Sequence, residues 1–133
     1  VERVTAPLEG YCQRRFLGYI GLNELTALQA SATANIYIHN NRCLFHHKAL
    51  ELIAAGRPIL SYPYETEETR AMAAEVGCPL FVCEDRNHIA DAMDVIAVGN
   101  FPASDPQVLA RFPWEARAKT LEMVLSKAIG GDR

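Results

Sequence analysis

The middle of the chain carries a group of residues whose types could do chemistry. They lie in the segment CLFHHKALELIAAGRPILS and are Cys43, His46, His47, Lys48 and Glu51. Positions 43, 47 and 51 are four apart and positions 48 and 51 are three apart, so in a helix Cys43, His47, Lys48 and Glu51 share one stripe. The residues between them are mostly apolar, which is typical of a helix that packs on a sheet. The segment therefore predicts a packed helix with a polar stripe.

The elements that must position this stripe alternate along the chain. Short apolar runs predict strands, and longer runs with helical periodicity separate them. Gly56 and Gly77 each follow a helical run and each precede a proline, which is a signal for the end of a helix and the start of a strand. The predicted strands are RRFLG (14–18), ANIYIH (34–39), RPILSY (57–62) and PLFVC (79–83), with VERVTA (1–6) as a fifth candidate. The predicted helices cover residues 22–32, 45–55, 65–76 and 86–98.

After Gly99 the pattern changes. The segment FPASDPQVLARFPWEARAKTLEMVLSKAIG predicts a short helix and then a long C-terminal helix, with Trp114 as its packing anchor. The whole pattern is that of an α/β fold: one Rossmann-like domain over residues 1–133, with an open parallel sheet and helices on both faces. Ligands of such sheets bind at the carboxyl ends of the strands. Here that edge comprises residues 19–23, 39–47, 62–67 and 84–87.

The polar stripe is expected at this edge, near the N-terminus of its helix. A positive helix end beside Lys48 and the histidines favours an anion such as a phosphate, and Glu51 can accept hydrogen bonds from sugar hydroxyls. A metal site built from His39, Cys43, His46 and His47 is disfavoured, because the spacing matches no standard site and adjacent helical residues point about 100° apart. We predict no metal and no cofactor.

Two neighbouring groups at this edge have more than one interpretation. Tyr62, Pro63 and Tyr64 either cover a ligand or form a turn whose aromatic rings pack on the next helix. Acidic side chains suit the first turn of that helix, and Glu67 is the one expected nearest a ligand. The other two acidic residues are Glu65 and Glu68.

Composition excludes several classes of protein. The chain has 133 residues, 50% of them hydrophobic, and a formal net charge of -3, which argues against a protein that binds nucleic acid through its overall charge. No apolar run is long enough to cross a membrane, and VERVTAPLEG lacks the features of a secretion signal. Four cysteines without zinc-site spacing indicate free thiols, and so we predict a cytoplasmic location. The abrupt start on VERVTA suggests a fragment of a longer protein.

The order of these motifs resembles the C-terminal, donor-binding half of a GT-B glycosyltransferase, close to glycosyltransferase family four (group 1). The resemblance covers roughly residues 14 to 129. It runs through FLGYIGLNELTALQASATANIYIHN and HHKALELIAAGRPILSYP to FPWEARAKTLEMVLSKAI, and its most specific part is KALELIAAGRPIL. It implies an enzyme that transfers a sugar from a nucleotide diphosphate sugar to an acceptor, with a separate N-terminal domain that binds the acceptor.

The resemblance also implies roles for single residues. Glu51 occupies the place of the glutamate that binds the ribose of the donor, and Gly18, Tyr19 and Ile20 occupy the loop whose backbone meets the nucleobase. The family often has a second glutamate eight residues before the first, where this chain has Cys43. The remaining donor-binding candidates are Lys48, His47, His46 and Glu67. No catalytic residue is assigned.

Two alternatives remain. The same half-fold occurs in nucleotide-sugar epimerases, and the chain could also be a non-catalytic, flavodoxin-like interaction domain. Because the family's phosphate-binding arginine and lysine come from a β-α unit upstream of Val1, and its acceptor site from the N-terminal domain, this chain alone is expected to bind the donor weakly and to turn over nothing.

Overall fold

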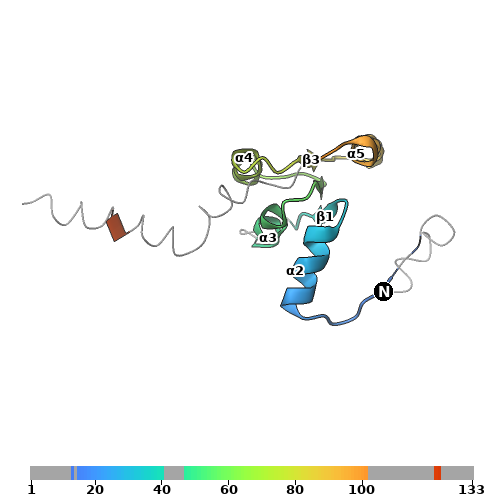
Figure 1. The fold of residues 1–133 in the computed structure, drawn as a ribbon. Coiled ribbons are helices and arrows are strands. Elements are labelled where there is room, and N and C mark those ends of the chain that lie inside the picture. The colour runs from blue at the N-terminus through green and yellow to red at the C-terminus, as the bar shows by residue number, and fades with distance from the viewer. Residues whose placement is uncertain (1–12, 14, 41–46, 102–121, 124–133) are drawn as a thin grey trace, which may run out of the picture.

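The fold is a three-stranded parallel sheet with helices packed against it. The computed structural model describes residues 13, 15–40, 47–101 and 122–123. In the described part the strands lie in the order β1-β2-β3 (Figure 1). The elements are α2 (Leu22–Ser31), β1 (Asn35–Ile38), α3 (His47–Ala55), β2 (Ile59–Tyr62), α4 (Glu67–Glu75), β3 (Leu80–Val82) and α5 (Arg86–Val98).

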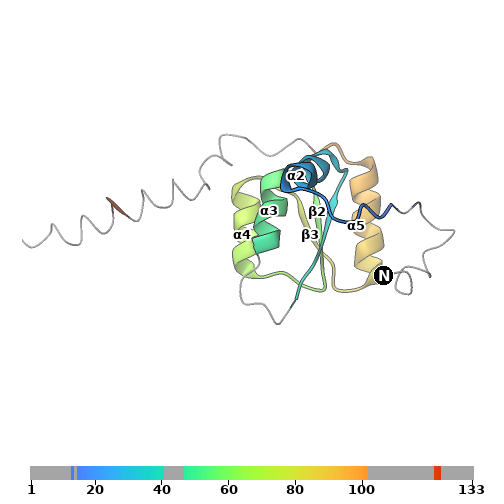
Figure 2. The ribbon, with the colours of Figure 1, turned by 90° about the horizontal axis from the view of Figure 1, so that it is seen from below.

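The helices cover both faces of this sheet. Figure 2 shows α3 and α4 on one side of the strands and α5 on the other. We call these two sides the α3 face and the α5 face. Asn35 pairs with Ile59, and Ile36 pairs with Leu60, which in turn pairs with Phe81. The predicted α/β architecture with a parallel sheet and helices on both faces is confirmed for this part of the chain.

Each face has its own apolar core. On the α3 face the buried cluster contains Tyr37, Ala49, Leu52, Ile53, Ile59, Ala73, Val76 and Cys78. On the α5 face a smaller cluster contains Leu60, Cys83 and Ala92, with Phe81 and Ile89 packed against it. Among the described residues, the α3 face therefore has the larger buried apolar cluster.

Buried and exposed side chains alternate along strand β1, but its isoleucines are the exposed ones. Its polar Asn35 and its Tyr37 are buried toward the α3 face, as is His39 directly after the strand. The isoleucines between them, Ile36 and Ile38, point to the α5 face and are both 71% exposed, because successive strand residues point to opposite faces. Among the described residues, the α5 face is thus covered over β2 and β3 but not over β1.

Both predicted glycine stops are confirmed. Gly56 and Gly77 have φ values of 69°, in the left-handed region that glycine enters without steric cost. After α4, Cys78 N donates to Ala73 O at 2.8 Å and Gly77 N donates to Ala74 O at 3.1 Å, the hydrogen-bond pattern of a Schellman motif. This geometry ends the helix and directs the chain into β3.

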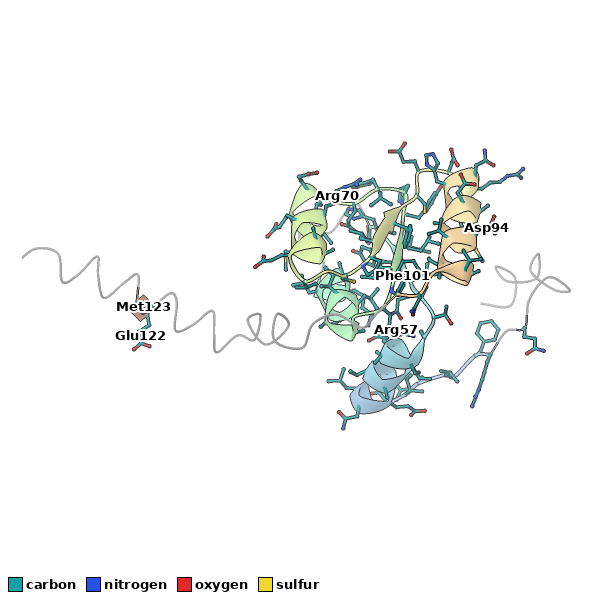
Figure 3. All side chains as sticks on the ribbon, turned by 45° about the horizontal axis from the view of Figure 1, so that its top comes forward. Arg57, Arg70, Asp94, Phe101, Glu122 and Met123 are labelled. Carbon is teal, nitrogen blue, oxygen red and sulfur yellow. The ribbon has the colours of Figure 1, made fainter. Side chains whose placement is uncertain are left out.

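Helix α2 attaches to the rest mainly through hydrogen bonds. None of its residues is buried. Arg57 Nε donates to Ala32 O at 2.6 Å, and Asn35 Nδ2 donates to Gln29 O at 3.1 Å. Figure 3 shows Arg57 beside the end of α2. These two bonds hold the end of α2 against the start of β1 and the loop before β2.

One strand prediction is wrong. Arg15, Phe16, Leu17 and Gly18 of the RRFLG segment form no strand, and Phe16 is 60% exposed. A strand needs a hydrogen-bonded neighbour, and among the described residues β1 pairs on one side only, with β2. The VERVTA candidate and Trp114 lie outside the described residues. Of the predicted C-terminal helix only Glu122 and Met123 are described, both helical and exposed.

Candidate functional site

The carboxyl edge of the sheet is where side chains from different strands meet. Its described residues are His39 and Asn40 after β1, Tyr62–Thr66 at the end of β2, and Cys83–Asp85 after β3. Helix α4 begins here with Thr66 as N-cap, whose side chain accepts a hydrogen bond from Thr69 N, and α5 begins here with Asp85 as N-cap. In parallel α/β sheets this is the edge at which ligands bind.

The predicted residues Lys48 and Glu51 lie together near the start of α3. Lys48 Nζ donates to Glu51 Oε2 at 2.6 Å, and the two side chains are 43% and 50% exposed. Glu51 is about 6 Å along the helix axis from its first residue, at 1.5 Å per residue. Leu52 and Ile53 on the same helix are buried against the sheet. An amphipathic α3 thus presents the pair to solvent, where a ligand can reach it.

Residues Gly18, Tyr19 and Ile20 do not join this pair. They lie in the segment before α2, where Gly18 has a left-handed φ of 67° and the Tyr19 side chain is 100% exposed. The Tyr19 side chain therefore packs on no other described group, and the expected contact of this segment's backbone with a nucleobase stays a prediction. Glu67 is the first residue of α4 and is exposed, which fits the predicted acidic first turn.

Three predicted residues cannot be placed. Cys43 and His46 lie outside the described residues, and His47 is the first residue of α3, with only its backbone described. Of the four candidate metal ligands, only the His39 side chain is described. In the described part of the chain, no group of three or more His, Cys, Asp or Glu side chains could hold a metal ion.

The structure reveals a buried polar cluster at this edge. His39 Nδ1 lies 3.4 Å from Glu65 Oε1, and the two side chains are only 2% and 0% exposed. Glu65 Oε2 accepts a hydrogen bond from Ser61 Oγ at 2.9 Å, and Oε1 accepts one from Thr66 N at 2.9 Å. A buried carboxylate is retained only where donors satisfy it. Glu65 therefore ties the end of β1, the end of β2 and the start of α4 together.

The arrangement of this cluster is not that of a nucleophilic triad. In such a triad the histidine takes the proton of the nucleophile, and the carboxylate orients the histidine. Here the Ser61 hydroxyl donates to Glu65 Oε2, while His39 contacts the other oxygen of the same carboxylate. Serine and histidine thus both face Glu65. This geometry fixes a loop and does not activate the serine.

Two aromatic side chains flank the buried cluster on opposite faces. The Tyr64 ring lies over His39 with 4.0 Å between ring centroids and an interplanar angle of 45°, and Tyr64 is 41% exposed. Tyr62 is also exposed but pairs with Ile38, so it points to the α5 face. Tyr64 therefore packs on His39, while the two interpretations of this segment, a cover over a ligand or a turn packed on the next helix, both stay predictions.

At the end of β3, the carboxylate whose pKa is shifted is the N-cap residue of α5, Asp85. Hydrogen bonds from His88 N and Asn87 N to Asp85 Oδ1, at 3.0 Å and 2.7 Å, lower the pKa of Asp85 below its ordinary value of 3.8. Burial, together with the nearby Asp85 carboxylate, raises the pKa of the Cys83 thiol above its ordinary value of 9.0. Cys78 and Cys83 are both buried and outside any disulfide, as predicted, and its raised pKa makes the Cys83 thiol a poor nucleophile.

The sequence contained a signal for the buried cluster. His39 directly follows one strand and Glu65 follows the next, and the carboxyl ends of neighbouring parallel strands meet at one edge. Both residues lie in segments predicted to form that edge. What the sequence does not reveal is that Glu65 turns inward while Glu67 and Glu68 remain exposed.

Comparison of the chain with models of protein families, with curated proteins and with solved structures found no match. Among the helices of the described residues, none combines the length and the apolar character that crossing a membrane requires.

Proposed function

We propose that this chain is the nucleotide-sugar-binding domain of a GT-B glycosyltransferase, and that it works with a separate acceptor-binding domain. The intact enzyme would transfer a sugar from a nucleotide diphosphate sugar to an acceptor, in the cytoplasm. The proposal rests on the resemblance of KALELIAAGRPIL, in α3 and β2, to the donor-binding segment of that family.

The observation that carries the proposal is the position of the Lys48–Glu51 pair. It lies on the first turns of a helix that starts at the carboxyl edge of a parallel sheet, and both side chains are about half exposed. The ion pair engages Glu51 Oε2, and a carboxylate has about four acceptor sites on two oxygens. Glu51 can therefore accept hydrogen bonds from ribose hydroxyls while Lys48 holds its orientation.

The test is a titration of the intact protein with UDP-glucose, UDP-N-acetylglucosamine and GDP-mannose by isothermal calorimetry. Hydrogen bonds to a charged group contribute about 1.5–3 kcal/mol, so Glu51→Ala should weaken binding of the preferred donor by about tenfold or more. Glu75→Ala is the matched control, because Glu75 is an exposed helix carboxylate at the end of α4 remote from the carboxyl edge. Equal affinities of Glu51→Ala and the wild type would refute the assignment of Glu51.

A second candidate is a non-catalytic binding domain. The observation that favours it is the short Lys48–Glu51 contact itself, since an exposed pair three residues apart on a helix is also an ordinary surface ion pair. The same titration separates the two candidates. Absence of binding to every nucleotide sugar and to UDP and GDP would favour the non-catalytic domain.

A further inference from the structure

Tyr64 is an exposed aromatic residue held in place from the protein interior. Its ring packs on the imidazole of His39 in a tilted contact, with 4.0 Å between ring centroids, and His39 in turn contacts the buried Glu65 carboxylate at 3.4 Å. The Tyr64 backbone carbonyl also lies 3.4 Å from Ser61 Oγ, as a long hydrogen-bond acceptor. A side chain ordered in advance loses less conformational entropy when a ligand binds to it.

A cation reaches the loop that carries this ring, from helix α4. Arg70 Nε donates to Glu65 O at 3.3 Å, so the guanidinium sits against the backbone of the residue that follows Tyr64. Figure 3 shows Arg70 on the side of α4 nearer to the strands. A guanidinium has five N–H donors in a planar fork and can pair with a phosphate while one of them is used internally.

We propose that Tyr64 and Arg70 form a subsite for the sugar phosphate of the donor, in which the sugar ring packs on Tyr64 and a phosphate pairs with Arg70. This inference rests on the proposed function, and adds two residues that were not among the donor-binding candidates of the motif. Sugar rings present C–H groups that suit the negative face of an aromatic ring. Ligand sites combine such apolar surfaces with a few fixed polar groups.

The ring, and not the hydroxyl of Tyr64, is the proposed contact. Tyr64→Phe keeps the ring and should bind donors like the wild type, whereas Tyr64→Leu should weaken binding of a nucleotide sugar about three- to tenfold. Binding of UDP or GDP, which lack the sugar, should change less than twofold in Tyr64→Leu. Arg70→Ala should weaken both the nucleotide sugar and the diphosphate by about tenfold.

The matched control for Tyr64→Leu is Tyr62→Leu. Tyr62 has a similar exposed fraction, 38% against 41%, but it lies on the α5 face, so Tyr62→Leu should leave donor affinity unchanged. All variants are first compared with the wild type by thermal unfolding. For Tyr64→Leu the readout is the ratio of nucleotide-sugar to diphosphate affinity, so a general loss of stability, which lowers both affinities together, does not mimic the expected result. For Arg70→Ala, which should lower both affinities, an unchanged melting temperature excludes a general loss of stability.

The outcomes separate this inference from the proposed function. If Glu51→Ala weakens binding and Tyr64→Leu leaves the affinity ratio unchanged, the subsite is wrong and the proposed function stands. If Tyr64→Leu changes the ratio and Glu51→Ala has no effect, the subsite stands and the ribose assignment is wrong. If the wild type binds no nucleotide sugar and no diphosphate, both are overturned.

Discussion

Glu65 offers the sharpest test of how the carboxyl edge is held together. Its side chain is fully buried, and its two oxygens accept hydrogen bonds from Ser61 Oγ and Thr66 N and contact His39 Nδ1. Glu65→Ala removes the carboxylate, so Ser61 Oγ, Thr66 N and His39 Nδ1 lose this contact at once. Each buried donor left without an acceptor costs about 1–3 kcal/mol, and the two hydrogen-bond donors concerned are Ser61 Oγ and Thr66 N.

We therefore expect Glu65→Ala to lower the free energy of unfolding by about 2–6 kcal/mol, because two donors lose their acceptor. Glu65→Gln keeps one acceptor oxygen and should cost about 1–2 kcal/mol. The measurement is guanidinium chloride unfolding followed by far-ultraviolet circular dichroism, in which the midpoint reports the change in stability at constant slope.

The control is Glu67→Ala, two residues further along. Glu67 is exposed in the first turn of α4, where its interaction with the helix dipole contributes about 0.3–1 kcal/mol. If Glu65→Ala proves no more destabilising than Glu67→Ala, the buried cluster does not hold the three elements together, and the physical account of this edge is refuted.

Two further predictions concern the ends of helices. Because hydrogen bonds lower the pKa of Asp85 in the folded state, its stabilising effect is present above about pH 4 and is lost as the pH falls through the folded pKa. Unfolding curves of the wild type and Asp85→Ala should thus converge in acid, whereas Asp85→Asn, which caps without titrating, should show no such trend relative to Asp85→Ala. An added Cβ at Gly77 meets nothing within 4 Å, so Gly77→Ala should cost about 1 kcal/mol from left-handed backbone strain alone. Gly77→Asn, which tolerates this conformation better, should recover part of that loss in the same denaturant assay; equal stabilities of the two variants would contradict the strain argument.

Local signals predicted most of the described fold. The four helices start and end within about two residues of their predicted bounds, the usual uncertainty of helix ends. At the C-terminal ends of α3 and α4 this precision comes from Gly56 and Gly77, which adopt the left-handed conformation that glycine enters without steric cost. The prediction of a strand at RRFLG failed because strand pairing depends on residues that are distant in the sequence. Residues 15–18 have the composition of a strand but no neighbouring strand among the described residues.

The candidate site was predictable only in part. The Lys48–Glu51 pair follows from helix periodicity, since residues three apart share a face. The inward turn of Glu65 depends on where His39, Ser61 and Thr66 lie in three dimensions, and the composition of the acidic run ETEE does not distinguish its first glutamate from the others. A buried polar cluster is determined by tertiary packing, and hence sequence periodicity alone could not identify it.

The bare part of the α5 face has a thermodynamic consequence. Ile36 and Ile38 each leave 71% of their surface in water, and full burial of an isoleucine side chain contributes about 1.5–3 kcal/mol. Anything that covers these two residues only in the folded state stabilises that state by mass action. A ligand or partner that packed on Ile36 and Ile38 would therefore raise the melting temperature of the chain, and the rise would grow with its concentration and affinity.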